Sequence, residues 1–280
     1  MHHETSRRTF LGAAAMLGGA LAGSPAGAAP ETQSGAVKLG ICSYSFGKGK
    51  LADEIGTIKT ARVRYINIKP EFHLLYDSSP AQIAGIKKLL DDNGLILAGT
   101  GATYLLKPDA GEIRQRFEFN KALGSPLIVI GPTVETLPMI EKCVKEYDIK
   151  VAVHNHGPSD KHFPTPQSAL AAIQGMDSRV GLCMDIGHTM RSGVNPAEAA
   201  KIAGARLLDL HTKDVHLAKD GKWVSADCGD GDIDLPALFR QLKKQGFSGF
   251  SNLEYEVGGP GKDLGIQRSM SYLRGVAAAI

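Results

Sequence analysis

Short apolar runs rich in β-branched residues alternate with longer amphipathic stretches from about residue 37 onward. A run of about four to eight such residues is typical of a buried strand, and apolar positions that recur every three or four residues indicate a helix. The pattern predicts eight strands, at Val37–Ser43, Tyr65–Lys69, Ile96–Thr100, Leu127–Gly131, Val151–His154, Val180–Asp185, Leu207–His211 and Gly249–Glu254. It also predicts eight helices, at Leu51–Arg62, Pro80–Asn93, Glu112–Leu123, Val134–Tyr147, Thr165–Gly175, Pro196–Gly204, Leu235–Gln245 and Ile266–Ala279.

The alternation of these elements predicts the fold. Strands that alternate with helices indicate a parallel sheet, and eight such units in about 250 residues match a single (β/α)8 TIM barrel. An open doubly wound sheet is the alternative, but its first strand–helix turn should carry GxGxxG, which Ser43–Gly47 lacks. Capping side chains before a first-turn proline support three helix starts: Ser79-Pro80, Thr165-Pro166 and Asn195-Pro196.

The first 28 residues have the features of an export signal. Ser6-Arg7-Arg8 is a twin-arginine sequence, an Ala/Gly/Leu run follows, and Ala26-Gly27-Ala28 is a small-residue cleavage pattern. The apolar run is shorter than the about 20 residues that span a bilayer. We therefore expect a twin-arginine signal peptide over residues 1–28, a barrel over 29–280 and a periplasmic location, with an uncleaved membrane anchor as the alternative.

Composition and charge argue against several classes of protein. The chain has 280 residues, of which 43% are hydrophobic and 22% charged, so it is neither disordered nor fibrous. The 32 Lys and Arg nearly balance the 29 Asp and Glu, which does not fit a nucleic-acid-binding face. The cysteines are few and form no CxxC pair, so they fit small buried side chains better than a disulfide framework or a zinc knuckle: Cys42, Cys143, Cys183 and Cys228.

Polar side chains end four consecutive predicted strands, the fifth to the eighth: His154, Asp185, His211 and Glu254. The carboxyl ends of barrel strands share one rim, where TIM-barrel enzymes carry their active sites. Two carboxylates buried side by side are costly unless a cation neutralises them. The sequence therefore predicts one divalent transition metal held by these four residues. Two imidazoles and two carboxylates suit manganese, cobalt, zinc or iron better than magnesium or calcium.

Three further residues follow these strand ends. His156 lies two positions beyond His154 and would point the same way if the strand continued, as a ligand of metal or substrate. His188 follows the sixth strand and is placed for a substrate hydroxyl. Lys213 follows the seventh strand, where it would act as an acid or base or would pair with Asp214 on the rim.

Two loops carry charges with more than one interpretation. Lys69, Glu71 and His73 end and follow the second strand, and would face the cavity mouth or be solvated loop residues. The acidic loop Asp227–Asp234 lacks the spacing and the terminal Glu of a calcium-binding EF-hand. We interpret it as a turn in which Asp234 caps the helix that follows.

With these residues assembled, the chain resembles the sugar phosphate isomerase/epimerase superfamily of xylose-isomerase-like barrels. The motifs that carry the resemblance span about half of the mature chain: Val151–Gly157, Cys183–His188, Leu210–Asp214, Gly229–Asp234 and Asn252–Glu256. Each motif alone is weak, but together they are specific. The resemblance implies one metal ligand on each of strands five to eight, which is the placement expected from the strand ends.

The chain departs from the family pattern at His154, where ketose epimerases typically have Glu. Two carboxylates shuttle a proton in those enzymes, and only Glu254 of the pair is present here. One base with a separate acid suffices for elimination. The chain is similar to an exported branch that resembles lyases of 3-keto-glycosides, in which the 3-ketone acidifies H2 and loss of H2 expels the aglycone from C1.

The expected function is therefore a metal-dependent elimination on 3-keto-glycosides. A keto-sugar isomerase or epimerase is one alternative, and a non-catalytic periplasmic protein that binds sugar or metal is another. Apurinic endonucleases share the barrel but need more metal ligands and a basic face, which the formal charge of +3 does not favour. The expected site residues are Lys69, His156, Lys213 and Glu254 as catalytic groups, and Glu71, His73 and His188 as substrate-binding groups.

Overall fold

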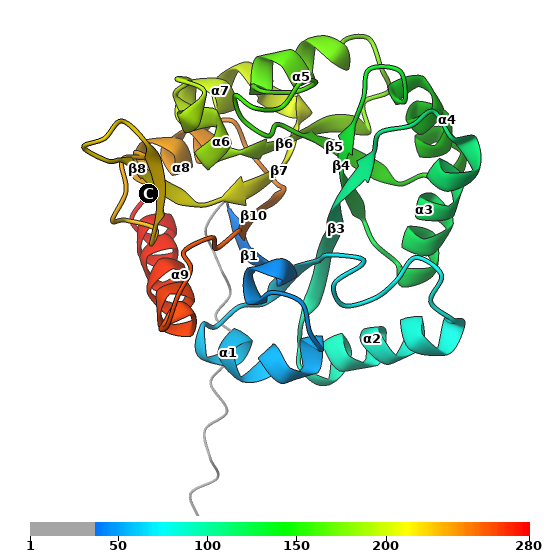
Figure 1. Ribbon diagram of the computed structural model, residues 1–280, viewed down its shortest axis with the longest axis horizontal. Coiled ribbons are helices and arrows are strands. Elements are labelled where there is room, and N and C mark those ends of the chain that lie inside the picture. The colour runs from blue at the N-terminus through cyan, green and yellow to red at the C-terminus, as the bar shows by residue number, and fades with distance from the viewer. Residues whose placement is uncertain (1–36) are drawn as a thin grey trace, which may run out of the picture. The chain divides into compact units, whose positions relative to one another are not determined.

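Eight parallel strands close into a barrel in the computed structural model, which describes residues 37–280 (Figure 1). Around the barrel the strands follow the order β1-β10-β7-β6-β5-β4-β3-β2. This arrangement confirms the predicted single (β/α)8 TIM barrel, while the predicted signal peptide, residues 1–28, lies outside the described residues. The barrel strands are β1 Lys38–Cys42, β2 Tyr65–Ile68, β3 Ile96–Leu105, β4 Leu127–Pro132, β5 Lys150–His154, β6 Val180–Asp185, β7 Leu207–Thr212 and β10 Phe250–Leu253.

Helices surround the barrel and bury its outer face (Figure 1). Because both faces of the strands are covered, the strands are buried along most of their length, and all six residues of β6 are buried. The α-helices are α1 Ile55–Thr60, α2 Pro80–Asp92, α3 Ala110–Leu123, α4 Leu137–Tyr147, α5 Pro166–Ala172, α6 Ile186–Arg191, α7 Pro196–Ala203, α8 Leu235–Lys244 and α9 Lys262–Ala278. Short 3-10 turns lie at Ser43–Phe46, Leu51–Glu54 and Gly204–Arg206.

The predicted helix starts are confirmed by side-chain caps. Ser79 accepts a hydrogen bond from the backbone of Gln82, and Thr165 accepts one from Ser168. Asn195 caps α7 in the same way, and each of these helices has a proline in its first turn. Asp234 caps α8, as predicted, by accepting from the backbone N–H of Ala237 at 2.8 Å.

An antiparallel hairpin, β8 Asp214–Leu217 and β9 Trp223–Ala226, follows β7 and was not predicted. The fully buried Asp214 organises the acidic loop behind it. Its carboxylate accepts from the backbone N–H groups of Val215 at 2.9 Å, Gly229 at 2.9 Å, Gly231 at 3.2 Å and Ile233 at 3.2 Å. The loop therefore wraps an internal carboxylate. Of the two alternatives for Lys213, the ion pair with Asp214 is wrong, because Asp214 accepts from these backbone groups and Nζ of Lys213 lies next to Asp185, Glu254 and Glu256 instead.

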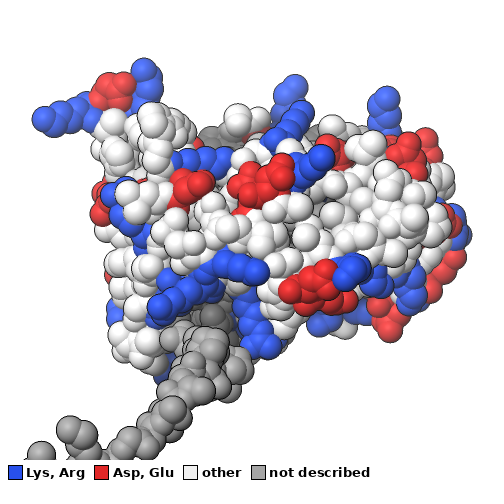
Figure 2. All heavy atoms as spheres, turned by 90° about the horizontal axis from the view of Figure 1, so that it is seen from below, with Lys and Arg blue, Asp and Glu red and all other residues white. Residues whose placement is uncertain are grey.

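Cysteines and surface charges agree with the composition. All four cysteines are buried and unpaired. Lys and Arg are interspersed with Asp and Glu over the face seen in Figure 2. Among the helices of residues 37–280, none combines the length and apolarity needed to cross a bilayer.

Candidate metal centre at the barrel mouth

The structure brings the four predicted ligand residues together at the carboxyl ends of the strands. His154 and Asp185 end β5 and β6, His211 lies near the end of β7, and Glu254 directly follows β10. The register pairs Asp185 with His211, so neighbouring strands deliver their last side chains to one level. One donor atom from each of the four residues lies within 4.8 Å of every other.

The donor atoms fit a divalent cation. Nε2 of His154 and Nε2 of His211 are buried and make no hydrogen bond, whereas the buried Oδ2 of Asp185 and Oε2 of Glu254 lie 3.0 Å and 2.9 Å from Nζ of Lys213. Buried polar atoms without partners are rare and costly, so such a cluster indicates a site built for a ligand. Nε2 of His154 lies 3.4 Å from Oδ2 of Asp185, and Nδ1 of His211 lies 3.3 Å from Oε2 of Glu254. Donors about 2.1 Å from one tetrahedral ion are spaced by about 3.4 Å.

Lys213 supplies a positive charge inside this cluster. Its side chain is 2% exposed, and Nζ lies 3.0 Å from Oδ2 of Asp185 and 2.9 Å from Oε2 of Glu254. It donates a hydrogen bond to Oε1 of Glu256 at 2.6 Å. Burial lowers the pKa of Lys213, but the three carboxylates outweigh it and raise the pKa above its usual value. Lys213 is therefore an ammonium ion.

The pKa values of the neighbouring carboxylates shift in the opposite direction, to below their usual values. Burial alone would raise the pKa of Asp185, but Lys213 and the flanking imidazoles hold it well below the ordinary range. The pKa of Glu254 is also lowered, because Lys213 and His211 outweigh the effect of burial. Both groups are therefore carboxylates, which is the form that binds a metal ion.

Three imidazoles line the approach to the cluster. Burial lowers the pKa of His154, and it lowers the pKa of His188 to about 4. Both rings are therefore neutral near pH 7. Nη1 of Arg191 lies 3.5 Å from Nδ1 of His188, which leaves Nε2 of His188 on the side of Asp185, 4.0 Å from Oδ2. The ring of His156 is 4.5 Å from that of His188, and 43% of its side chain is exposed.

Lys69 forms part of the wall of the barrel mouth. Nζ donates to the carbonyl oxygen of Ala102, lies 4.0 Å from Oε2 of Glu71 and lies 5.2 Å from the centre of the Tyr104 ring. Burial lowers the pKa of Lys69, although Glu71 opposes the shift. Its ammonium form is thus less favoured than that of an exposed lysine, in contrast to Lys213.

Glu71 and His73 occupy a different position from His188. Glu71 has a side chain that is 51% exposed, and Nδ1 of His73 donates to the carbonyl oxygen of Gly49 at 3.0 Å. Both residues line a shallow pocket of about 370 Å³ next to α2. Of the three predicted substrate residues, His188 is the one in contact with the ligand cluster.

A model of the xylose isomerase-like TIM barrel family matches residues 63–276. The chain belongs to this family. The resemblance carried by the strand-end motifs is therefore confirmed at the level of the family.

Individual relatives of this xylose isomerase-like barrel are distant. The rhizopine catabolism protein MocC of Rhizobium meliloti is 28% identical over 125 residues, which cover 40% of this chain and 38% of that protein. The 3-oxo-isoapionate decarboxylase of Pectobacterium atrosepticum is 26% identical over 184 residues, which cover 59% of this chain and 63% of that protein. The chain thus spans less than two thirds of the length of both curated relatives.

Solved structures support the fold of this xylose isomerase-like barrel. The 3-keto-D-glucoside 4-epimerase YcjR of E. coli has a TM-score of 0.71 and is 17% identical, over 85% of this chain and 99% of that chain. An identity this low shows a shared fold and no more.

The sequence analysis of this xylose isomerase-like barrel did not single out three residues that contact the predicted ligand His211 or its neighbour Lys213. The hydroxyl of Tyr44 lies 3.3 Å from Nδ1 of His211, and Glu256 holds Lys213. Oδ2 of Asp209 lies 4.0 Å from Nε2 of His211, and burial raises the pKa of Asp209 to about 7. Asp209 and Glu256 each stand two residues from a predicted ligand, and that period-two spacing was the available signal.

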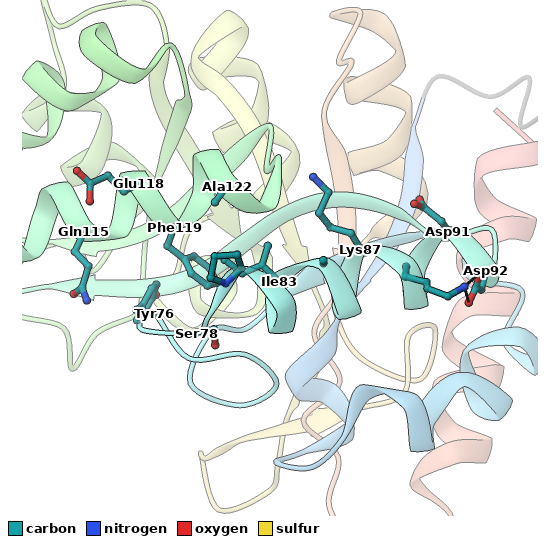
Figure 3. A pocket seen from close by; sticks show the side chains of 13 residues that line it. Tyr76, Ser78, Ile83, Lys87, Asp91, Asp92, Gln115, Glu118, Phe119 and Ala122 are labelled. Atoms are coloured by element: carbon teal, nitrogen blue, oxygen red, sulfur yellow. Dashed lines mark hydrogen bonds and ion pairs between the residues drawn. The ribbon is translucent and has the colours of Figure 1, made fainter.

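A larger pocket of about 750 Å³ lies elsewhere, on the outside of the barrel between α2 and α3 (Figure 3). Tyr76, Ile83 and Phe119 form its apolar floor, and Lys87 and Glu118 belong to its polar edge. None of the predicted site residues is in its lining. We therefore place the chemistry at the ligand cluster, where buried charges converge, rather than in the larger hollow.

Proposed function

We propose that this protein is a divalent-metal-dependent enzyme that removes a proton next to the carbonyl group of a keto sugar. Its reaction is proposed to be a 1,2-elimination on 3-keto-glycosides. The observation that carries the proposal is the set of four buried donor groups, His154, Asp185, His211 and Glu254, within 4.8 Å of one another. When bound there, a divalent transition metal supplies a Lewis acid that polarises a carbonyl oxygen.

The names of two similar proteins support a keto sugar as the substrate. One is a decarboxylase of 3-oxo-isoapionate and the other is a 4-epimerase of a 3-keto-D-glucoside. Both names place the oxo group at position 3. A ketone at C3 acidifies the hydrogen on C2, which is the proton that the proposed elimination removes.

The charge states of the surrounding side chains favour particular acid and base roles. Lys69 is the proposed base, because burial lowers its pKa and increases the fraction present as the free amine. Lys213 is held as a cation by Asp185, Glu254 and Glu256, so it acts through its charge and not as a base. The partly exposed His156 is the proposed acid for the leaving group.

The proposed elimination uses one base and one acid. The base takes the proton from C2, and the electron pair of the broken C2–H bond forms the C1–C2 double bond. The bond between C1 and the glycosidic oxygen breaks, and the departing aglycone oxygen receives a proton from the acid. Water then adds to the unsaturated keto sugar at C1, which gives net cleavage of the glycoside without an oxidant or reductant. His188 is proposed to bind a sugar hydroxyl, because its free Nε2 points toward the cluster.

An NMR experiment tests this function. The protein, loaded with manganese, cobalt or zinc, is incubated in D2O with methyl 3-keto-glucosides and with simple ketoses. Release of methanol together with an unsaturated or hydrated 3-keto sugar is the expected result. Deuterium incorporation into an epimer or isomer, without release of methanol, would establish the isomerase or epimerase alternative. Full metal occupancy with no exchange in any sugar would overturn catalysis and favour a binding protein.

We also propose that the enzyme works in the periplasm. The twin-arginine sequence Ser6-Arg7-Arg8 and the small residues at Ala26–Ala28 support this location. Cell fractionation tests it: the wild-type chain should be recovered from the periplasm without residues 1–28, and the double variant Arg7→Lys/Arg8→Lys should remain in the cytoplasm. Recovery of the full-length chain from the membrane would indicate an uncleaved anchor.

A further inference from the structure

A small depression lies next to Tyr104, whose ring also contacts His156 and Lys69 at the barrel mouth. It has a volume of about 250 Å³ and lies between the carboxyl ends of β3 and β4 and the loop that follows β5. Tyr104, Leu106, Pro132 and Phe163 give it an apolar lining, and Asp160–His162 form a polar edge. A cavity of about 150 Å³ is large enough to hold a benzene molecule. The depression can therefore hold one aromatic ring.

Tyr104 belongs both to this depression and to the barrel mouth. Its ring meets the ring of His156 edge to face, with the centres 6.3 Å apart and the planes at 84°. Nζ of Lys69 lies 5.2 Å from the centre of the same ring. His156 is in turn 5.6 Å from the ring of the predicted ligand His154. A group that leaves the reacting carbon near His156 therefore has an aromatic wall beside it.

The Tyr104 ring occupies the space that a side chain at position 131 would need, and that residue is a glycine. Tyr104 pairs with Gly131 in the register of β3 and β4. A Cβ on Gly131 would lie 2.7 Å from Cδ1 and 2.8 Å from Cε1 of Tyr104, so the ring lies directly on the glycine. Tyr104 nevertheless remains 46% exposed, which leaves ring surface open to a ligand.

We propose that this depression is an aglycone subsite that takes a flat aromatic group. The inference rests on the proposed function, because it assumes that a glycoside binds with its sugar at the ligand cluster. An aromatic aglycone would pack against Tyr104, since aromatic rings favour edge-to-face or offset contacts with one another. Asp160 and Lys161 at the edge carry opposite charges, so the edge has no net charge that would favour a charged ring over a neutral one.

Benzyl and methyl 3-keto-glucosides, each in both anomers, test the subsite. Their leaving alcohols are similar in acidity, so the ratio of the two kcat/KM values reports binding of the ring. In the wild type we expect a benzyl-to-methyl ratio of about 10 or more. Tyr104→Ala should reduce the ratio to near 1, and Gly131→Ala should reduce it by displacing the ring. Tyr104→Phe should keep it.

A matched control is Val134→Ala, which removes an exposed apolar side chain outside the lining and should leave the ratio unchanged. Metal content and thermal midpoint establish that each variant is folded. A wild-type ratio near 1, or a high ratio that survives both Tyr104→Ala and Gly131→Ala, overturns the subsite.

A binding measurement separates this inference from the proposed function. Benzyl and methyl glucosides that carry no ketone are titrated into the metal-loaded protein by calorimetry, so that no turnover is needed. Tighter binding of the benzyl compound in the wild type, lost in Tyr104→Ala, would support the subsite even if no 3-keto-glycoside reacts. Equal binding of both compounds would reject the subsite even if elimination is observed.

Discussion

His154 distinguishes this donor set from one that contains three carboxylates. A neutral imidazole is a softer ligand than a carboxylate and favours later transition metals. We predict that His154→Glu still binds a divalent ion but shifts the preference toward harder ions such as Mn²⁺. Competition dialysis of wild type and variant against equimolar Mn²⁺, Co²⁺ and Zn²⁺, followed by metal analysis, measures the shift. An identical metal distribution in both proteins would contradict the prediction.

Lys213 would compete with a cation bound at this cluster for the same oxygens. Its Nζ lies within 3.0 Å of carboxylate oxygens of both Asp185 and Glu254, where like charges would repel a divalent ion. We predict that Lys213→Met binds Mn²⁺ or Co²⁺ more tightly, by about 10-fold or more, while the metal-free protein loses about 3 kcal/mol of stability because two carboxylates stay buried without a partner. Calorimetric titration and urea unfolding with a chelator measure the two effects.

The control for this variant is Lys88→Met, which removes an exposed lysine paired with Asp92 at 2.8 Å. Such an exposed ion pair contributes little to stability. The metal affinity should therefore stay the same, and the free energy of unfolding should change by no more than this small contribution. Weaker metal binding in Lys213→Met than in Lys88→Met would mean that the ammonium holds the carboxylates in place instead of competing for them.

At the scale of elements, the loop between β9 and α8 depends on one buried carboxylate. Asp214 accepts four backbone N–H groups, and a Cβ on Gly231 would lie 2.1 Å from its Oδ1, so the loop packs tightly on this side chain. We predict that Asp214→Ala costs at least about 2 kcal/mol, because buried donors lose their acceptor. Urea unfolding measures the loss.

The exposed Asp230 in the same loop provides the matched control. Asp230→Ala should stay within about 0.5 kcal/mol of the wild type. Equal losses in both variants would show that general charge in the loop, and not the acceptor role of Asp214, stabilises this segment.

The elements that could be predicted are those with a long repeating pattern. All eight barrel strands were found because both their faces are buried, and boundaries shifted by a few residues, most of all at β3, which extends to Leu105. The six-residue α6 was missed, because it begins directly at the end of β6 and is too short to show a helical period. Asp185 serves both elements: Oδ1 accepts from the backbone of His188 at 2.8 Å and caps α6, while Oδ2 faces the ligand cluster.

At the scale of the whole molecule, barrel closure explains which site residues were predictable. The four predicted ligands come from β5, β6, β7 and the end of β10, which are consecutive around the barrel, so strand order alone puts them on one arc of the rim. Tyr44 reaches His211 from beyond β1, which lies past β10 in that order. Such a contact between non-neighbouring strands depends on the closed barrel and on side-chain size, neither of which a linear pattern contains.

Because its ligands come from several strands, a bound metal should stabilise the whole barrel. A ligand that binds only the folded state at 100 times its Kd adds about 2.7 kcal/mol. For a domain of this size that corresponds to a rise of about 5–10 °C in Tm. We predict this rise for the wild type on adding Mn²⁺ or Co²⁺, its reversal by a chelator, and its absence in Asp185→Ala and His211→Ala. Calorimetry with metal analysis checks each case, and full occupancy with an undiminished rise in both variants would place the metal outside this cluster.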